Sequence, residues 1–511
     1  MSEKKDSSSF SLKVMCVLIN KLLFFLPILS FAQNASIIID AGSQYQTIEG
    51  LGGWVESGTI RRGTPQEAYD STPLWDMLIN DLGLTQFQIS FPAAIEEQND
   101  NDDPNITNWS AFDPNRISYY PDGDFFGEGN VDIKALKALQ REASRSGSNI
   151  NFHMCAWGYP MWLTGWLGSG GKVNDYEELA ELVFAAIKIY RDQLGIPINI
   201  ISLINEPGMW MQAIPREISD MVVKVKTRFQ QEGLDTRIAA PETAGTGLID
   251  DYLFNTGDPW ILPYAEPYLD VYFYHIYDEL WFSTSGGGLD EILKFTERTG
   301  IPSWQTQACN YKLAGGDMTK TNTYEEGLYL GVHIHEVFVE AGSTGFIWWI
   351  LYAPTYNDPR SEGQILIDVD WGSLNPNPSP KYYAMKQFSR YIPVGAKRID
   401  VDVQGGDWDL LVSAYLHYDG TFTIVSINLG QERDVTFNLN GINLSSLNRI
   451  RFSEGENSQD IGILNISGLS FSDRIKGQSI TTYTTHSSND FTFLDTTPPA
   501  FPTGVTVRQN N

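Results

Sequence analysis

An Asn-Glu-Pro triplet at residues 205–207 is the clearest candidate for chemistry in this chain of 511 residues. It ends an apolar run over residues 198–204, and proline cannot donate to a sheet, so a strand must stop there. Barrel enzymes place catalytic side chains at the carboxyl ends of their strands, where a glutamate can transfer protons. The alternative is an ordinary strand exit with an exposed glutamate, and the triplet alone does not decide between the two.

Tryptophans lie on or just beyond several other apolar runs. Aromatic residues make up 13% of the chain and include 14 tryptophans, which favours a surface that stacks on flat ligands such as sugar rings, although a tryptophan-rich core is the alternative. Neighbours on a strand point in opposite directions, so Trp348 and Trp349 cannot both face one site. We expect some of the following to bind substrate and others to be core: Trp54, Trp157, Trp304, Trp348 and Trp349.

Eight apolar runs separated by helical patterns predict the elements that position these residues. Alternating strands and helices are typical of α/β proteins, and eight units over this length favour a (β/α)₈ TIM barrel. A doubly wound sheet is the second choice, but no glycine-rich phosphate loop follows the first strand. The expected strands are residues 50–55, 86–91, 149–155, 198–205, 237–240, 271–275, 303–308 and 345–351, and the expected helices are 133–146, 175–194, 215–233, 289–299 and 323–341.

The pattern changes near residue 392 to short alternating strands, which predict a C-terminal β-sandwich. We therefore expect a barrel over residues 46–391 and a sandwich over 392–494, which residues 33–45 join as an N-terminal strand. Residues 495–511 read as a linker and the start of a possible further module. Residues 1–32 combine Lys13 and Lys21, a short apolar stretch and a small-x-small cleavage site, so they predict an export signal peptide. The protein is expected to be secreted, periplasmic or on the cell surface.

Charge and cysteine content exclude several classes of protein. The formal net charge is −28, from 35 Lys plus Arg against 63 Asp plus Glu, and it opposes binding to nucleic acid. No segment after the signal predicts a membrane span. Beyond the signal only Cys155 and Cys309 remain; they could pair, but two buried thiols are expected. The histidines show no metal-ligand spacing, so neither metal nor cofactor is expected, and the oligomeric state is left open.

Five motifs occur in an order that resembles glycoside hydrolase family 30 of clan A, and the likeness covers nearly the whole mature chain. The motifs are Q-T-I-E-G-L-G-G at 46–53, I-N-E-P at 204–207, A-A-P-E at 239–242, Y-H-I-Y at 274–277, and Tyr383-Ala384-Met385 with Phe388-Ser389. The resemblance implies a barrel with an attached β-sandwich that cleaves β-glycosidic bonds with retention of configuration.

The same resemblance implies roles for individual residues. Glu206 matches the general acid/base, and Asn205 would bind the 2-hydroxyl of the sugar. Glu242 matches a glutamate whose role stays open, while His275 and Tyr277 would lie beside the nucleophile. A retaining enzyme needs a second carboxylate that attacks the sugar.

That second carboxylate is missing at the matching position. Gln307 stands where the family has its nucleophilic glutamate, and Gln88 stands where it has an arginine that contacts the nucleophile. An amide cannot form the glycosyl ester, and the joint loss of a carboxylate and its cation avoids an unpaired buried charge. The explanations left open are an engineered change, catalysis assisted by a 2-acetamido group of the substrate, a glycan-binding protein, a misalignment by one residue, or a substitute carboxylate among Glu242, Asp278 and Glu279.

The sequence thus predicts an exported glycoside hydrolase that acts on a β-linked polysaccharide, with Glu206 and Gln307 at its centre. The alternative is a non-catalytic glycan-binding protein on the same scaffold. A purely structural or protein-binding module is a third reading.

Overall fold

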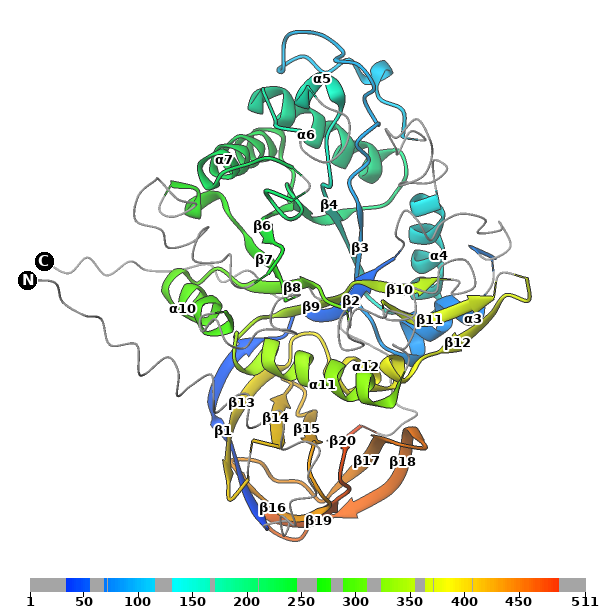
Figure 1. The fold of residues 1–511 in the computed structure, drawn as a ribbon, viewed down its shortest axis with the longest axis vertical. Helices are drawn as coiled ribbons and strands as arrows, with labels where there is room; N and C mark the ends of the chain where they lie inside the picture. Colours follow the sequence, from blue (N-terminus) through cyan, green and yellow to red (C-terminus); the bar gives the residue numbers. More distant parts are fainter. Residues whose placement is uncertain are drawn as a thin grey trace, which may run out of the picture.

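The computed structural model contains a closed barrel and a second, larger sheet, with helices around the barrel and between the two (Figure 1). It describes residues 34–55, 69–70, 72–114, 131–165, 171–209, 211–245, 264–276, 288–309, 323–353, 364–370, 372–406 and 408–486. The expected signal peptide, the expected C-terminal linker and Tyr277 lie outside these ranges. Within them, none of the helices combines the length and hydropathy needed to cross a membrane.

Eight parallel strands close the barrel in sequence order, so the predicted fold class is confirmed. Both faces of the strands are covered, which explains why they read as nearly continuous apolar runs. Each predicted run contains one strand, although the run ending in Asn205 forms a strand only as far as Ser202. The strands are β2 (Gly50–Trp54), β3 (Gln86–Ser90), β4 (Asn151–Cys155), β5 (Ile198–Ser202), β6 (Arg237–Thr243), β7 (Val271–His275), β8 (Ser303–Gln307) and β9 (Gly345–Trp348).

Helices surround the barrel and follow the predicted amphipathic segments. Gly233 and Gly300 end two of them in the left-handed conformation, with φ of 66° and 72°. The helices are α3 (Thr72–Asp76), α4 (Val131–Ser146), α5 (Met161–Thr164), α6 (Tyr176–Asp192), α7 (Pro215–Glu232), α10 (Leu289–Thr299), α11 (Tyr324–Val339) and α12 (Pro380–Ser389), with a π-helical turn η1 (Met77–Asp81) and 3₁₀ turns η2 (Trp109–Ala111) and η4 (Glu266–Tyr268).

Asp175 caps α6, because its side chain accepts hydrogen bonds from the backbone N–H groups of Glu177 and Glu178. We expect Asp175→Ala to lower the free energy of unfolding by about 1 kcal/mol, since these donors lose their acceptor at the helix start. Asp175→Asn keeps a side-chain oxygen and should lose much less. Urea unfolding of both variants measures the difference, and equal stability of the two would show that the cap contributes nothing.

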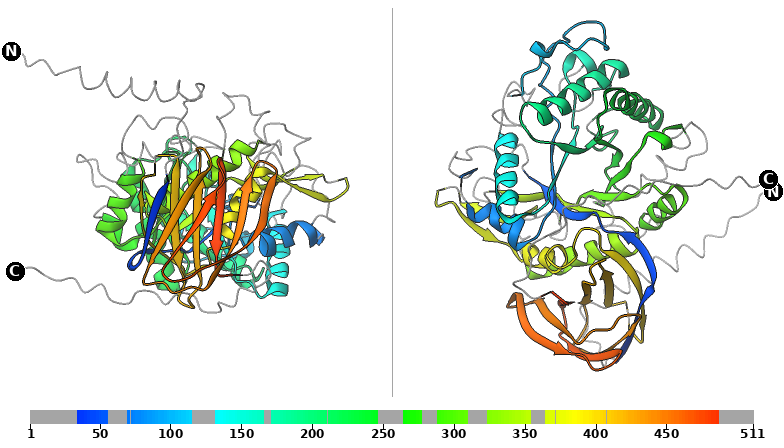
Figure 2. Two further views of the ribbon diagram at one scale, coloured as in Figure 1. Left: turned by 90° about the horizontal axis from the view of Figure 1, so that it is seen from below. Right: turned by 180° about the vertical axis from the view of Figure 1, so that it is seen from behind.

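The second sheet has nine strands in the order β18-β17-β20-β15-β14-β13-β1-β16-β19 and curls around its own apolar core (Figure 2). Strand β1 (Ala35–Thr47) comes from the N-terminal side and pairs antiparallel with β13 (Lys397–Gln404) and parallel with β16 (Arg433–Asn440). The other strands are β14 (Leu410–Leu416), β15 (Phe422–Asn428), β17 (Ser446–Ser453), β18 (Glu456–Asn465), β19 (Ser470–Ile475) and β20 (Ser479–Thr484).

Helices α11 and α12 fill the layer between the barrel and this sheet (Figure 1). The two helices share a buried ion pair, Lys381 with Glu326, at 3.3 Å. Thr482 of β20 donates to the backbone and side-chain oxygens of Gln387 on α12, both at 2.8 Å. The sheet is therefore joined to the barrel through a packed, hydrogen-bonded layer. A small three-stranded sheet of β10 (Ile350–Ala353), β11 (Ile365–Asp370) and β12 (Asn375–Pro378), which the sequence did not predict, extends β9.

Candidate active site

The segment after β5 holds Asn205 and Glu206 by the backbone of its neighbours. Asn205 N donates to Ala156 O at 2.8 Å, and Glu206 N donates to Glu242 O at 3.0 Å. Glu206 adopts the left-handed conformation with φ of 46°, which is strained for a residue that is not glycine. Strain of this kind persists only where surrounding contacts impose it, as they do here. The Glu206 side chain is 5% exposed and lies at the carboxyl end of the barrel strands.

Gln307, the last residue of β8, meets the same segment from across the barrel. Its Nε2 donates to Asn205 Oδ1 at 2.8 Å, and both residues are buried. The structure therefore brings Gln307 together with the segment that carries Asn205 and Glu206. The hydrogen bond fixes the amide orientation, because only the NH₂ end of Gln307 can donate to a carbonyl oxygen.

His275, at the end of β7, lies between two carboxylates. Its Nδ1 is 2.9 Å from Glu206 Oε1, and its Nε2 is 3.5 Å from Glu242 Oε1. Burial opposes the charged imidazolium, but the two carboxylates outweigh it and raise the pKa of His275. His275 is therefore placed to carry a positive charge inside the site.

Glu242 is fully buried and has donors on both oxygens. Oε1 accepts from Gln88 Nε2 at 3.0 Å, and Oε2 accepts from the Cys155 thiol at 2.8 Å. Burial raises the pKa of this carboxyl, but contacts with His275 and Cys155 outweigh burial, so the net pKa of Glu242 is lowered. Glu242 also has a left-handed backbone, φ 54°, directly after the cis peptide bond between Ala240 and Pro241.

Gln88 and Cys155 were not among the predicted site residues. Gln88 was noted only as a departure from the family, and Cys155 only as a buried thiol at a strand end. Both residues are polar and lie within or at the end of a strand that is otherwise apolar. A polar side chain buried in this way needs a hydrogen-bond partner inside the barrel, and this pattern could have identified them. Burial and the Glu242 carboxylate raise the pKa of Cys155 well above its ordinary value, so it stays a thiol that can donate. Cys155 and Cys309 are both buried, and no disulfide joins them.

Three tryptophans pack together at one end of the barrel interior, two of the three ring pairs edge to face and the third tilted. Trp54 has ring centroids 5.8 Å from Trp157 and 5.1 Å from Trp349, and Trp157 lies 5.5 Å from Trp349. Trp157 and Trp349 are only partly buried, so they present aromatic surface beside the strand ends. Trp54 is almost fully buried beneath them. Trp54 and Trp157 were predicted here, and Trp349 takes the place expected for Trp348.

The structure does not bring Trp304 and Trp348 to this site. Trp304 lies deeper in the barrel against His153, at 5.0 Å between ring centroids, and its Nε1 points to Glu49, which precedes β2. Trp348 is fully buried outside the barrel interior, and its indole N–H donates to Gln364 O at 2.7 Å. Both are core residues. Alternation along the strand turns Trp348 away from the barrel interior while Trp349 faces inward.

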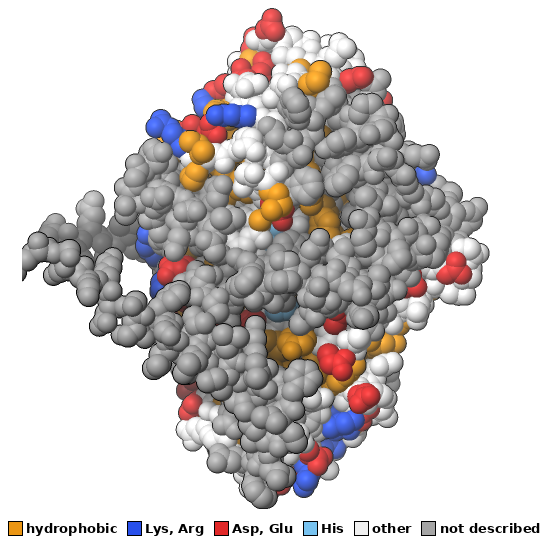
Figure 3. Space-filling view, viewed as in Figure 1, with side chains coloured by type: hydrophobic (Ala, Val, Ile, Leu, Met, Phe, Trp, Pro, Cys, Tyr) orange, Lys and Arg blue, Asp and Glu red, His pale blue; other side chains and the backbone are white. Residues whose placement is uncertain are grey.

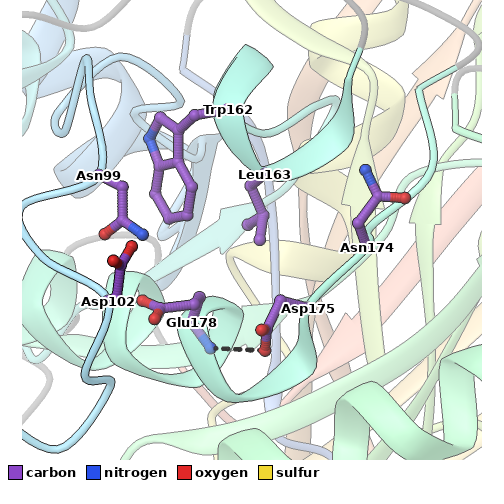
Figure 4. Close-up of a pocket in the computed structure, with 7 residues that line it drawn as sticks. All are labelled: Asn99, Asp102, Trp162, Leu163, Asn174, Asp175 and Glu178. Carbon is purple, nitrogen blue, oxygen red and sulfur yellow. Dashed lines mark hydrogen bonds between the residues drawn. The ribbon is translucent and has the colours of Figure 1, made fainter.

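A separate pocket lies beside α5 and the start of α6 (Figure 4). Its walls come from the loop after β3 and from these two helices, and the side chains of Asn99 and Asp102 point toward each other. None of the predicted site residues lines it. Among the described residues, no three His, Cys, Asp or Glu side chains are grouped to hold a metal ion. Acidic side chains of the described part are scattered over the face in Figure 3 rather than gathered in one patch.

Comparison with known proteins gives the relationship. No protein-family model matches the chain. The glucuronoxylanase XynC of Bacillus subtilis is 26% identical over 320 residues, which cover 61% of this chain and 67% of that enzyme. The resemblance to glycoside hydrolase family 30 is thereby confirmed. By this relationship the chain is similar to glycoside hydrolases.

Solved structures agree with this family at the level of the fold. A GH30 endoxylanase from Clostridium papyrosolvens C71 superposes with a TM-score of 0.64 at 19% identity, covering 88% of this chain and 99% of that one. An endo-β1,6-glucanase superposes with a TM-score of 0.62 at 18% identity, covering 91% and 95%. The same fold thus occurs in a xylanase and in a glucanase, so the fold does not select the polysaccharide.

Proposed function

We propose that this protein is an exported glycoside hydrolase that acts on a β-linked polysaccharide. The observation that carries the proposal is the 2.8 Å contact between Gln307 and Asn205, the residue next to Glu206. Glu206 is proposed to protonate the leaving oxygen and, as a carboxylate, to activate water. Asn205 is proposed to bind the sugar 2-hydroxyl, since its Nδ2 is buried and has no partner among the described residues. Trp157 and Trp349 are proposed to stack on the sugar chain.

A covalent glycosyl ester is not open to this chain at Gln307, because an amide is not the nucleophile of a retaining enzyme. The nucleophile would then come from the substrate, as in assisted hydrolysis by a 2-acetamido group, or from a substitute carboxylate; the candidates Asp278 and Glu279 lie outside the described residues. Glu242 is unsuited to replace it: the carboxylate is fully buried, and its two oxygens already accept from Gln88 and Cys155.

Because both carboxylate oxygens of Glu242 already accept hydrogen bonds, this residue does not supply a nucleophile. This favours a second candidate function, a protein that binds a β-linked glycan without cleaving it. The site retains the aromatic surface and the buried donor of Asn205, which serve binding as well as catalysis. In this second candidate, Glu206 stays paired with His275, and the part of the chain that the structure describes offers no second carboxylate beside Gln307 to complete the reaction.

Glu206→Gln separates these functions. Reducing ends released from a panel of β-linked polysaccharides are measured for the parent chain and this variant, and binding is measured by titration calorimetry. If the parent cleaves, Glu206→Gln should lower the rate roughly 100-fold or more, the range of a positioned proton-transfer group. Glu291→Gln on the outer helix α10 removes the same charge away from the site and should change neither quantity.

Binding without cleavage by the parent would support the glycan-binding candidate. Cleavage or binding that is the same in Glu206→Gln as in the parent would show that the site has been assigned to the wrong residues.

A further inference from the structure

Glu242 is built into the site as a buried charge rather than as a reacting group. Its carboxylate is fully buried, and donors from two neighbouring strands occupy it: Gln88 of β3 at 3.0 Å and Cys155 of β4 at 2.8 Å. A carboxylate shielded in this way cannot approach a sugar carbon. It can, however, hold a cation beside it, because a buried charge needs a partner of opposite sign.

The group beside it is His275, whose two ring nitrogens face two different carboxylates. Nδ1 lies 2.9 Å from Glu206 Oε1, and Nε2 lies 3.5 Å from Glu242 Oε1. A neutral imidazole has one N–H and can donate to only one acceptor, whereas the imidazolium donates from both nitrogens. Since both neighbours are acceptors when ionised, the arrangement fits the cation.

We propose that Glu242 and His275 form a buried ion pair whose function is to position Glu206, with the imidazolium donating to Glu206 Oε1 on the side away from Glu242. Both are positioning residues, because they act through Glu206 and do not touch the sugar. The inference rests on the proposed role of Glu206 and adds the group that orients it.

The charges around His275 support this pair. Of the described residues, Glu206, Glu242 and the Cys155 thiol are the titratable groups that face it or its partner, and Gln88 and Asn205 are neutral. The pKa of His275 is raised and that of Glu242 is lowered, so each shift favours the charged form of its group. The raised pKa of His275 makes its contribution to stability complete below the ordinary imidazole value of about 6.5 and lost as the pH rises through the raised value.

Imidazole ¹⁵N resonances of the labelled protein test the pair without requiring any enzymatic activity. We expect His275 to carry both protons at pH 7. Glu242→Gln should lower its pKa by about one unit or more, because one of its two carboxylates is gone. Gln88→Arg should shift it in the same direction, since a cation beside Glu242 competes for that carboxylate. Burial lowers the pKa values of His153 and His335 to about 3 and about 4, so their neutral rings serve as internal controls.

A His275 titration that is unchanged in Glu242→Gln would overturn the proposal, provided that near-ultraviolet circular dichroism shows a native fold. If Glu242→Gln does not fold, Gln88→Arg decides, and an unchanged titration there overturns the proposal equally. A neutral His275 at pH 7 in the parent does the same.

A kinetic measurement distinguishes a positioning role from a merely structural one. In the Gln307→Glu background, adding Glu242→Gln should move the high-pH limb of glycan cleavage to lower pH, because His275 loses its proton earlier. A uniform loss of rate with no change in the pH profile would contradict the positioning role. If the titration behaves as expected while Glu206→Gln alters neither cleavage nor binding, the ion pair stands and the proposed function fails.

Discussion

Gln307→Glu is expected to cleave a β-linked polysaccharide with retention of configuration, at a higher rate than the parent chain. Gln307 lies at the end of β8 and contacts Asn205, the residue next to Glu206. A carboxylate there supplies the missing nucleophile, so the sugar can be transferred to the protein and then to water. We expect turnover to rise roughly 1000-fold or more, the scale on which loss of a catalytic nucleophile acts.

Reducing-end release by the parent, Gln307→Glu and Gln307→Ala on the same polysaccharide panel measures this effect. Gln307→Ala is the matched control, since it disturbs the same position without adding a carboxylate. Proton NMR of the first product should show retained anomeric configuration, and a structure of the variant should place the two carboxyl groups about 5–5.5 Å apart. Inverted product, or equal rates for all three proteins, would remove Gln307 from the nucleophile position.

The new carboxylate lacks the arginine that the family places near it, because Gln88 occupies that position and contacts Glu242. An unpaired buried charge is unfavourable, so Gln307→Glu alone should be less stable than the parent. Adding Gln88→Arg should recover stability and increase cleavage further. No gain from the second substitution would mean that residue 88 serves Glu242 alone.

Gly52→Ala is expected to have the largest effect on stability. A Cβ at this position would lie 1.6 Å from the backbone oxygen of Gln86 on the paired strand β3, and a backbone atom in a barrel cannot move aside as a side chain can. We expect the free energy of unfolding to fall by about 4 kcal/mol or more, or the protein not to fold. The Q-T-I-E-G-L-G-G motif therefore contains a glycine needed for close approach of two strands.

Urea unfolding followed by tryptophan fluorescence measures this loss. Gly158→Ala is the control, since a Cβ there meets no atom within 4 Å and the backbone has no positive φ. Equal stability of Gly52→Ala and the parent would show that β2 and β3 lie further apart than described.

The sequence was sufficient for the barrel because burial on both faces leaves continuous apolar runs that can be read one strand at a time. It was not sufficient for β18 and β19 at the edges of the second sheet, whose side chains are largely exposed and polar, so no apolar alternation marks them. In the site, motif order identified Glu206, Gln307, Glu242 and His275. The contacts that Gln88 and Cys155 make with Glu242 depend on which side chains of β3 and β4 point into the barrel. The sequence of one strand buried on both faces does not show which side chains point inward.

The placement of Trp348 shows the same limit. Two adjacent tryptophans could be assigned opposite directions, but the sequence does not say which of the two faces inward. The indole N–H of Trp348 donates to Gln364 O in the loop before β11, and this contact holds the Trp348 side chain on the outer face of the barrel. The sequence of the strand itself does not contain this information, because Gln364 lies outside it.

Strand β1 has a consequence for how the chain acquires its fold. It lies between β13 and β16, so Ser36 pairs with Gln404 and Ile37 with Phe437. During synthesis, this strand emerges before the whole barrel, and its partners β13 and β16 follow only after most of the described residues. Pairing over such a separation is slow, and an unpaired strand edge is a template for association with other chains. Strand β1 is thus a segment that needs protection from aggregation until β13 and β16 are available to pair with it.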